Sequence, residues 1–238
     1  MMRCRKRDKL SGRIIRAMLV LALAATAGAC SFELPGSGAP PRMYVLTPKS
    51  TFGEALPAVD WQLLIEVPAS PAGINTARIS LSDSPIEMRY FANANWTDLA
   101  PKMVQTLLVE SFENSNRIVA VGREAIGLRA DYILKTDLRE FQAEYPSPLP
   151  REAAETEGST IPPVIRVRIN AKLIQLPRRD IVASDTFEFK VAADANSMVA
   201  IIGAFDDALG KSMKRLVEWT LQQGQEHYIP PREYPARR

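Results

Sequence analysis

Histidine and cysteine are scarce in this chain: its 238 residues include one His and two Cys. His227 lies in a polar stretch, where we expect solvent around it and no packed partner that would orient it as a general base. The patterns G-x-S-x-G, H-E-x-x-H and C-x-x-C are absent, as are the glycine-rich loops that hold phosphates. The sequence therefore predicts neither an enzyme nor a metal or cofactor site.

Long apolar runs are also missing. The one sustained run, residues 17–29, is shorter and richer in Ala than the ~20-residue helix that spans a bilayer. It follows a strongly basic segment and closes on small residues before Cys30, which is the order found in secretory signals. We predict that residues 1–29 are a signal peptide and that cleavage occurs before Cys30.

Cys30 is the residue that decides where the mature protein is held. The run Ala27-Gly28-Ala29-Cys30 resembles the bacterial lipobox, although Ala27 stands where a lipobox usually has Leu. The resemblance implies acylation of Cys30 and a lipid-anchored protein that faces the periplasm. Ser31 at the second mature position favours sorting of the lipoprotein to the outer membrane. The alternative is an ordinary signal peptide followed by a Cys that occurs there by chance.

Positive charge is concentrated in the predicted signal. The chain has 30 Lys and Arg against 27 Asp and Glu, and seven of the basic but only one of the acidic residues lie at positions 1–29. The remainder carries a net charge of about −3, so it gives no reason to expect a nucleic-acid partner. Cys4 also leaves with the signal, and Cys30 then has no second Cys with which to form a disulfide.

Three further segments follow the predicted signal. Residues 30–42 are rich in Pro, Gly and Ser and have no apolar period, which is typical of a flexible tether. Residues 43–221 carry strand and helix patterns in an amount that suits one domain. Residues 222–238 lose that periodicity and end in Pro and Arg, so we predict a mobile C-terminal tail.

For the first half of the domain, the sequence predicts strands followed by a helix. Residues 43–46 and 61–67 are short β-rich runs, and residues 78–81 and 87–91 form a predicted hairpin through a turn at 83–85. A helix that ends near residue 114 follows, capped by Thr97 or Asp98 and with Pro101 in its first turn. Residues 118–121 predict a short buried strand.

The second half has the clearest periodicity. Residues 132–138 alternate between apolar and polar side chains, which predicts a strand with one wet face, and Phe141 breaks the phase, as at a bulge or an edge. Residues 164–176 and 181–191 alternate in the same way around a turn at 177–180, and a helix with an apolar stripe starts at Asn196 or Ser197. We predict an α/β (α+β) fold: a two-layer domain with two long amphipathic helices on one face of a largely antiparallel or mixed sheet.

Residues 77–116 carry a resemblance to a known family. They contain a hairpin that ends in an aromatic pair, then Asn93 or Asn95 before Trp96, then Pro101 and a Leu-rich helix. This order is similar to that of the auxiliary lipoproteins of bacterial ABC-type intermembrane transport systems, the group that includes the paraquat-inducible protein C-like lipoproteins. The later strands and the C-terminal helix follow in the same order, so the likeness extends over residues 43–221.

The resemblance implies a non-enzymatic role in moving lipid or other hydrophobic cargo between two membranes. The implied partners are a substrate-binding protein of the mammalian-cell-entry (MCE) type and the permease and ATPase of the same system, with the membrane reached through the lipid anchor. A structural lipoprotein that forms a homo-oligomer and scaffolds the envelope without touching cargo is the alternative.

Three aromatic residues at the hairpin-to-helix junction are the candidate contact residues for a partner or a lipid. Tyr90, Phe91 and Trp96 bury large areas, and Tyr and Trp keep a polar end. The alternative for each is a place in the core. Three arginines and three glutamates also have two possible roles each. The arginines Arg89, Arg166 and Arg168 either meet lipid phosphates or coat a wet sheet face, and Glu152, Glu155 and Glu157 lie on a long loop that is either solvated or an arm to a neighbouring subunit.

Overall fold

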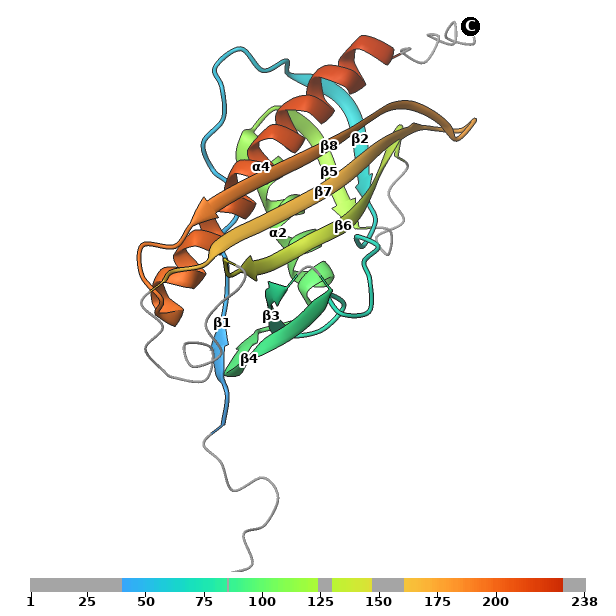
Figure 1. Cartoon of the computed structure of the whole chain (residues 1–238). Helices are drawn as coiled ribbons and strands as arrows, with labels where there is room; N and C mark the ends of the chain where they lie inside the picture. The colour runs from blue at the N-terminus through green and yellow to red at the C-terminus, as the bar shows by residue number, and fades with distance from the viewer. Residues whose placement is uncertain (1–39, 85, 124–129, 147–160, 229–238) are drawn as a thin grey trace, which may run out of the picture. The chain divides into compact units, whose positions relative to one another are not determined.

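One long strand, β6 (Tyr132–Glu144), organises the sheet of this protein (Figure 1). The computed structural model describes residues 40–84, 86–123, 130–146 and 161–228. The predicted signal, Cys30 and the acidic loop residues Glu152, Glu155 and Glu157 lie outside these ranges. The other elements are β1 (Arg42–Tyr44), β2 (Val59–Ile65), β3 (Arg78–Ser84), β4 (Glu87–Trp96), α2 (Ala100–Ser115), β5 (Ile118–Arg123), β7 (Val164–Gln175), β8 (Asp180–Ala192) and α4 (Met198–His227).

Each edge of β6 has a different set of neighbours. Along one edge, β7 pairs antiparallel over the full length of β6, and β8 pairs antiparallel with β7. Along the other edge, β2 pairs parallel near the start of β6 (Leu63 with Tyr132), and β3 pairs parallel near its end (Ser80 with Gln142). The sheet therefore forks, with β5 beyond β2 and with β4 and β1 beyond β3. The prediction of a mixed sheet is confirmed.

The change of phase at Phe141 corresponds to a bulge. The register between β6 and β7 shifts between Leu138 and Glu140, so one extra residue of β6 opposes the partner strand. The extra residue turns Phe141 back to the side of the sheet that carries Leu138, and both side chains are buried. The apolar set of β6 therefore faces the core on both sides of the bulge.

The hairpin differs from the prediction in its length. Strand β4 does not end at Phe91 but continues to Trp96, and its last three residues pair parallel with β1. Asn93 has a φ of 53°, a left-handed conformation that Asn adopts more readily than most residues. This conformation, together with a register shift between β3 and β4, lets the strand change direction without ending.

The two helices begin and end by different devices. Helix α4 is capped by Ser197, whose side chain accepts a hydrogen bond from the Ala200 amide, and the predicted start at Asn196 or Ser197 is confirmed. Helix α2 has Leu99 at its N-cap and no side-chain cap, so the predicted capping by Thr97 or Asp98 is wrong; the Asp98 carboxylate accepts from the Leu99 amide instead. Asn116 ends α2 in the left-handed conformation.

Helix α4 is longer than predicted because it includes part of the expected tail. It runs to His227, so residues 222–227 are helical. Gly224 lies against the indole of Trp61, and its carbonyl accepts a hydrogen bond of 3.0 Å from the Tyr132 hydroxyl. Residues 222–227 are mostly polar, so nothing in the sequence indicated that Gly224 packs on the ring of Trp61. His227 is exposed, as expected.

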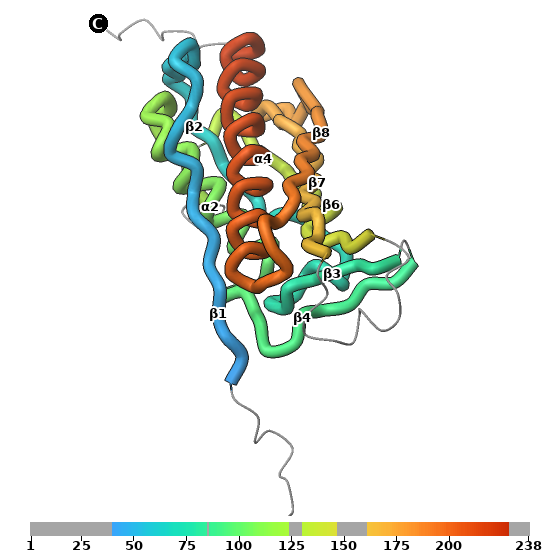
Figure 2. Tube along the Cα trace, turned by 60° about the vertical axis from the view of Figure 1, so that its left-hand side comes forward, coloured from blue at the N-terminus to red at the C-terminus, as the bar shows by residue number. Residues whose placement is uncertain are grey.

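The core lies between the inner face of the sheet and the two helices. Helix α4 packs along β7 and β8, α2 packs against β5 and β2, and the helices also touch each other. Trp96, Phe141 and Phe205 form an aromatic centre with ring centroids 5.1–5.5 Å apart. Figure 2 shows the chain between β1 and β2 following α4. Along it the Thr47 amide and hydroxyl donate to Asp206, and the Gly53 amide donates to Glu218.

The expected fold class is therefore confirmed only in its coarser form. The protein has a mixed α/β fold, in which a curled eight-stranded sheet combines with two helices. Only one helix is long, since α4 has 30 residues and α2 has 16. The fork at β6 divides one edge of the sheet into two parts, so a flat sheet under a single layer of helices is too simple a description.

Candidate functional site

Trp96, one of the three predicted contact residues, belongs to the core. It is 1% exposed, and its ring packs edge-on against Phe205 at 5.2 Å. It lies at the end of β4, where the strand pairs with β1 and leads into α2. Because no partner can reach this side chain without unfolding the junction, Trp96 has a packing role and is removed from the candidate contact residues.

Tyr90 is half-buried and held by its neighbours. Its hydroxyl donates to the Gly73 carbonyl at 3.0 Å, and the guanidinium carbon of Arg78 lies 3.7 Å from the centre of its ring. The cation–π contact and the hydrogen bond fix the orientation of the ring. Phe91 is also half-buried and packs against the core from β4. Both residues therefore keep part of their surface accessible beside the hairpin.

The most exposed apolar residues of the hairpin were not predicted from the sequence. Ile86 is 96% exposed at the turn, and Met88 is 39% exposed two residues further on. Arg89 of the same strand forms an ion pair with Asp83 across the hairpin, with Nη1 2.9 Å from Oδ2. The signal in the sequence was Ile86 itself, because a β-branched apolar residue is unusual in a turn that ordinarily carries polar residues. The hairpin therefore presents an apolar tip and a neutralised arginine.

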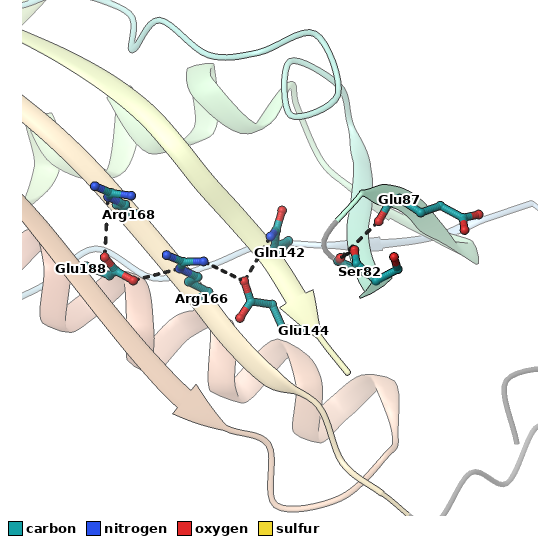
Figure 3. A network of polar contacts seen from close by, with 8 residues as sticks. Ser82, Glu87, Gln142, Glu144, Arg166, Arg168 and Glu188 are labelled. Atoms are coloured by element: carbon teal, nitrogen blue, oxygen red, sulfur yellow. Dashed lines mark hydrogen bonds and ion pairs between the residues drawn. The ribbon is translucent and has the colours of Figure 1, made fainter. Parts of the chain in front are cut away.

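Arg166 and Arg168 lie on the outer face of β7 in a network of ion pairs (Figure 3). Arg166 donates from Nε to Glu188 at 2.9 Å and from Nη1 to Glu144 at 3.2 Å, and Arg168 Nε is 3.6 Å from the second oxygen of Glu188. Burial opposes the charge of Arg166, but the two carboxylates outweigh it and raise the pKa of the guanidinium. The arginines therefore coat the sheet face, and their charges are already paired.

Two tyrosines have strongly shifted acidity without belonging to a reactive centre. Burial raises the pKa of Tyr132 to about 12, with Asp131 adding to the effect, and burial also raises the pKa of Tyr145 to about 12. Each phenol donates a hydrogen bond, Tyr132 to the Gly224 carbonyl at 3.0 Å and Tyr145 to the Asn196 side chain at 2.7 Å. Both hydroxyls therefore stay protonated at neutral pH and serve to fix the structure.

The described ranges hold no cluster of three or more His, Cys, Asp or Glu that could ligate a metal ion. Within the same ranges, no helix has the length and apolar character required to cross a bilayer.

The described surface thus combines an exposed apolar hairpin tip with ion pairs over the outer face of the sheet. The chain belongs to the family described as ABC-type transport auxiliary lipoprotein component, whose model matches residues 44–217. The prediction made from residues 77–116 is confirmed. The family is one of cell-envelope lipoproteins that accompany ABC-type transport systems, which agrees with the expectation of a protein that is not an enzyme.

Related proteins extend the comparison. A crystal structure of a Xanthomonas campestris protein is 31% identical, with a TM-score of 0.69, and covers 78% of this chain and 97% of its own. A second solved structure shares the fold at 10% identity, with a TM-score of 0.56, over 75% of this chain and 97% of its own. An uncharacterized protein of Bradyrhizobium diazoefficiens is 29% identical over 194 residues, which is 79% of this chain and 48% of that protein. The chain thus spans about half the length of this curated relative.

Proposed function

We propose that this protein is the membrane-anchored, periplasm-facing auxiliary lipoprotein of an ABC-type, MCE-linked system that moves lipid or other hydrophobic cargo between two membranes. The observation that carries the proposal is the family match, which covers nearly the whole of the described domain. Energy for transport comes from the ATPase of the system, because the sequence has no P-loop pattern. The outer membrane holds the anchor, attached to Cys30.

The lipid anchor and the tether determine where the domain acts. A lipid on Cys30 and the Pro-rich residues 30–42 confine the domain to a thin layer beside the membrane. Confinement makes a contact with a membrane-bound partner effectively intramolecular and raises its occupancy without adding any interaction. The domain then serves as a docking point that holds the MCE-type substrate-binding protein close to the membrane.

The β3–β4 hairpin is the part of the surface that we assign to this contact. Ile86 and Met88 supply exposed apolar area, and the half-buried Tyr90 lies beside Met88 on the same side of β4. Phe91 lies on the opposite side of the strand and packs against the core. A cluster with a large apolar residue at its centre is the usual basis of binding energy at a protein interface. A photo-crosslinking residue placed at Ile86 should capture the MCE-type protein in cells, whereas one placed at Val119 should not. Val119 is the matched control because it is 66% exposed and lies on β5, at the other end of the sheet.

The scaffold alternative makes a different prediction for the isolated domain. Residues 31–238, expressed without the lipid anchor, would be weighed by native mass spectrometry, and any lipid bound to them would be extracted. A monomer that carries phospholipid supports direct handling of cargo. A defined oligomer without lipid favours the structural role, in which the protein forms an assembly that guides its partner.

A further inference from the structure

A group of exposed apolar side chains lies where the chain enters the domain. Met43 of β1 and Val45, just beyond β1, are 54% and 64% exposed, and they alternate with Tyr44 and Leu46, which pack against the core. Since successive side chains of an extended chain point to opposite sides, Met43 and Val45 share the outer side. Val199, in the first turn of α4, is 79% exposed. Both elements therefore leave apolar side chains in water near their first residues.

Contacts further along show how the chain after β1 lies against α4. The Thr47 amide donates to Asp206 at 2.7 Å, and the Gly53 amide donates to Glu218 at 3.0 Å. Six residues of this segment thus advance alongside twelve residues of the helix, about 20 Å of extended chain against about 18 Å of helix. The segment therefore runs parallel to α4, with two of its residues for every four of the helix.

The same register brings the exposed residues together. Continued back from Thr47, it places Val45 level with Ile202 and Met43 level with the first turn of α4, which contains Val199. Figures 1 and 2 both show β1 beside the start of α4. Met43, Val45 and Val199 therefore form one exposed apolar surface, which we name the entry patch.

A lipid bilayer is the surface that lies within reach of the entry patch. Met43 follows the predicted lipid-bearing Cys30 by 13 residues, which span at most about 45 Å when fully extended. The charges at this end of the domain are mixed, because Arg42, Asp98 and Asp194 are all exposed. Apolar contact with lipid therefore suits this end better than attraction to anionic headgroups.

We propose that the entry patch inserts into the headgroup region of the membrane that holds the lipid anchor. The inference rests on the anchor of the proposed function and adds an orientation of the domain to it. A small apolar contact is enough, because the anchor makes this contact effectively intramolecular. Strand β4 meets β1 only through its last three residues, so the hairpin tip with Ile86 lies at the far end of β4 and remains available to a protein partner.

Fluorescent labelling of single cysteines tests the insertion. Once the signal is removed and Cys30 is acylated, an introduced Cys is the one free thiol of the chain. The acylated chain with Val45→Cys or Val199→Cys, labelled with the environment-sensitive dye NBD, would be reconstituted into phosphatidylcholine vesicles. Emission from both positions should shift to the blue and be quenched by nitroxide-bearing lipid. A label at Val119→Cys, 66% exposed on β5 at the other end of the sheet, should be quenched only by aqueous iodide.

A charge placed in the entry patch tests whether its residues act together. Met43→Glu should abolish the lipid quenching of a label at Val199→Cys, because a carboxylate is costly to remove from water. Ile181→Glu is the matched control and should leave the quenching unaltered, since Ile181 is 59% exposed at the start of β8, the end of that strand away from α4. Met43 and Ile181 both lie on the surface, so neither change should unfold the domain.

Flotation of the same vesicles separates the two proposals. A chain that does not float lacks the anchor, which overturns the proposed anchoring and this inference with it. A chain that floats while labels at residues 45 and 199 stay open to iodide has the anchor but overturns the insertion, and the entry patch would then serve a protein contact. Lipid quenching at residue 199 that persists in Met43→Glu would also overturn the inference, because the three residues would not form one contact surface.

Discussion

The two faces of the β6–β7 pair are made from the same strands but are stabilised in different ways. The inner face includes Leu134, Leu138, Phe141, Val167 and Ile169, all at most 1% exposed. The outer face carries ion pairs at 2.9–3.9 Å, which join Arg166 to Glu144 and Glu188, Lys135 to Glu66, and Lys172 to Asp137.

The comparison shows which properties depend on residue type and which depend on a particular neighbour. An inner residue contributes through the apolar area that it removes from water, so another apolar side chain of similar volume serves nearly as well. An outer residue contributes through one or two charged partners that remain partly in water, where each pair is worth little. Stability should therefore come mainly from the inner face, which leaves the outer face and its rim free for binding.

The largest expected effect compares the two faces within one strand. Phe141→Ala empties part of the aromatic centre and should lower the free energy of unfolding by about 3–5 kcal/mol. Lys135→Ala lies on the outer face of the same strand, where the side chain is about half exposed, and should cost less than about 1 kcal/mol. Urea unfolding of both variants measures the difference, and similar losses from the two would contradict the comparison.

The second effect concerns the segment of α4 that the sequence assigned to the tail. A Cβ at Gly224 would lie 2.3 Å from the Trp61 ring, so Gly224→Ala should destabilise the protein by about 1–3 kcal/mol. Gly203 lies in the same helix with no atom within 4 Å of a Cβ, and Gly203→Ala should be neutral or stabilising by up to about 1 kcal/mol. If both changes stabilise the helix, its last turns do not pack on β2.

Alkaline pH should weaken the inner face through Tyr132. Its pKa in the folded protein, about 12, lies above the ordinary value of 10, so the folded state holds the proton more tightly than the unfolded state. The resulting stability is present below pH 10 and is lost as the pH rises toward 12. In urea unfolding at a series of pH values, Tyr132→Phe should have a shallower decline over this range, in addition to a constant loss from the missing hydrogen bond to Gly224. An unchanged slope would show that the phenol titrates normally.

The smallest effects belong to the outer arginines. Arg166→Gln removes two ion pairs and should cost about 1 kcal/mol, since the side chain is only 24% exposed. Arg168→Gln loses one contact at 3.6 Å and should be close to neutral. Urea unfolding at low and high salt checks both values, and a loss of several kcal/mol for Arg168→Gln would mean that the outer face is part of the stable core.

Much of the fold was predictable because its signals are local. Alternation along β6, β7 and β8 identified the strands and the bulge near Phe141, and Ser197 marked the start of α4. The fork of the sheet was not predictable, because parallel pairing of β2 and β3 with opposite ends of β6 depends on contacts distant in sequence. The continuation of β4 past Asn93 was missed for the same reason, since its partner β1 lies about 50 residues earlier.

The site was harder to predict than the fold. Sequence reasoning chose aromatics by type, yet Trp96 is core and Tyr90 is engaged with Gly73 and Arg78, while the most exposed apolar residue of the hairpin is Ile86. Residue type predicts burial well, but accessibility at a junction depends on the tertiary structure.

The role as an accessory of a transporter is tested most directly by copurification of the full, Cys30-bearing chain from native membranes. A tagged chain, solubilised in mild detergent, should bring down the MCE-type protein, the permease and the ATPase in fixed proportions identified by mass spectrometry. Cys30→Ser should remove the chain from the membrane and abolish the complex. Recovery of the chain alone or as a homo-oligomer, with none of these three partners, would contradict the account.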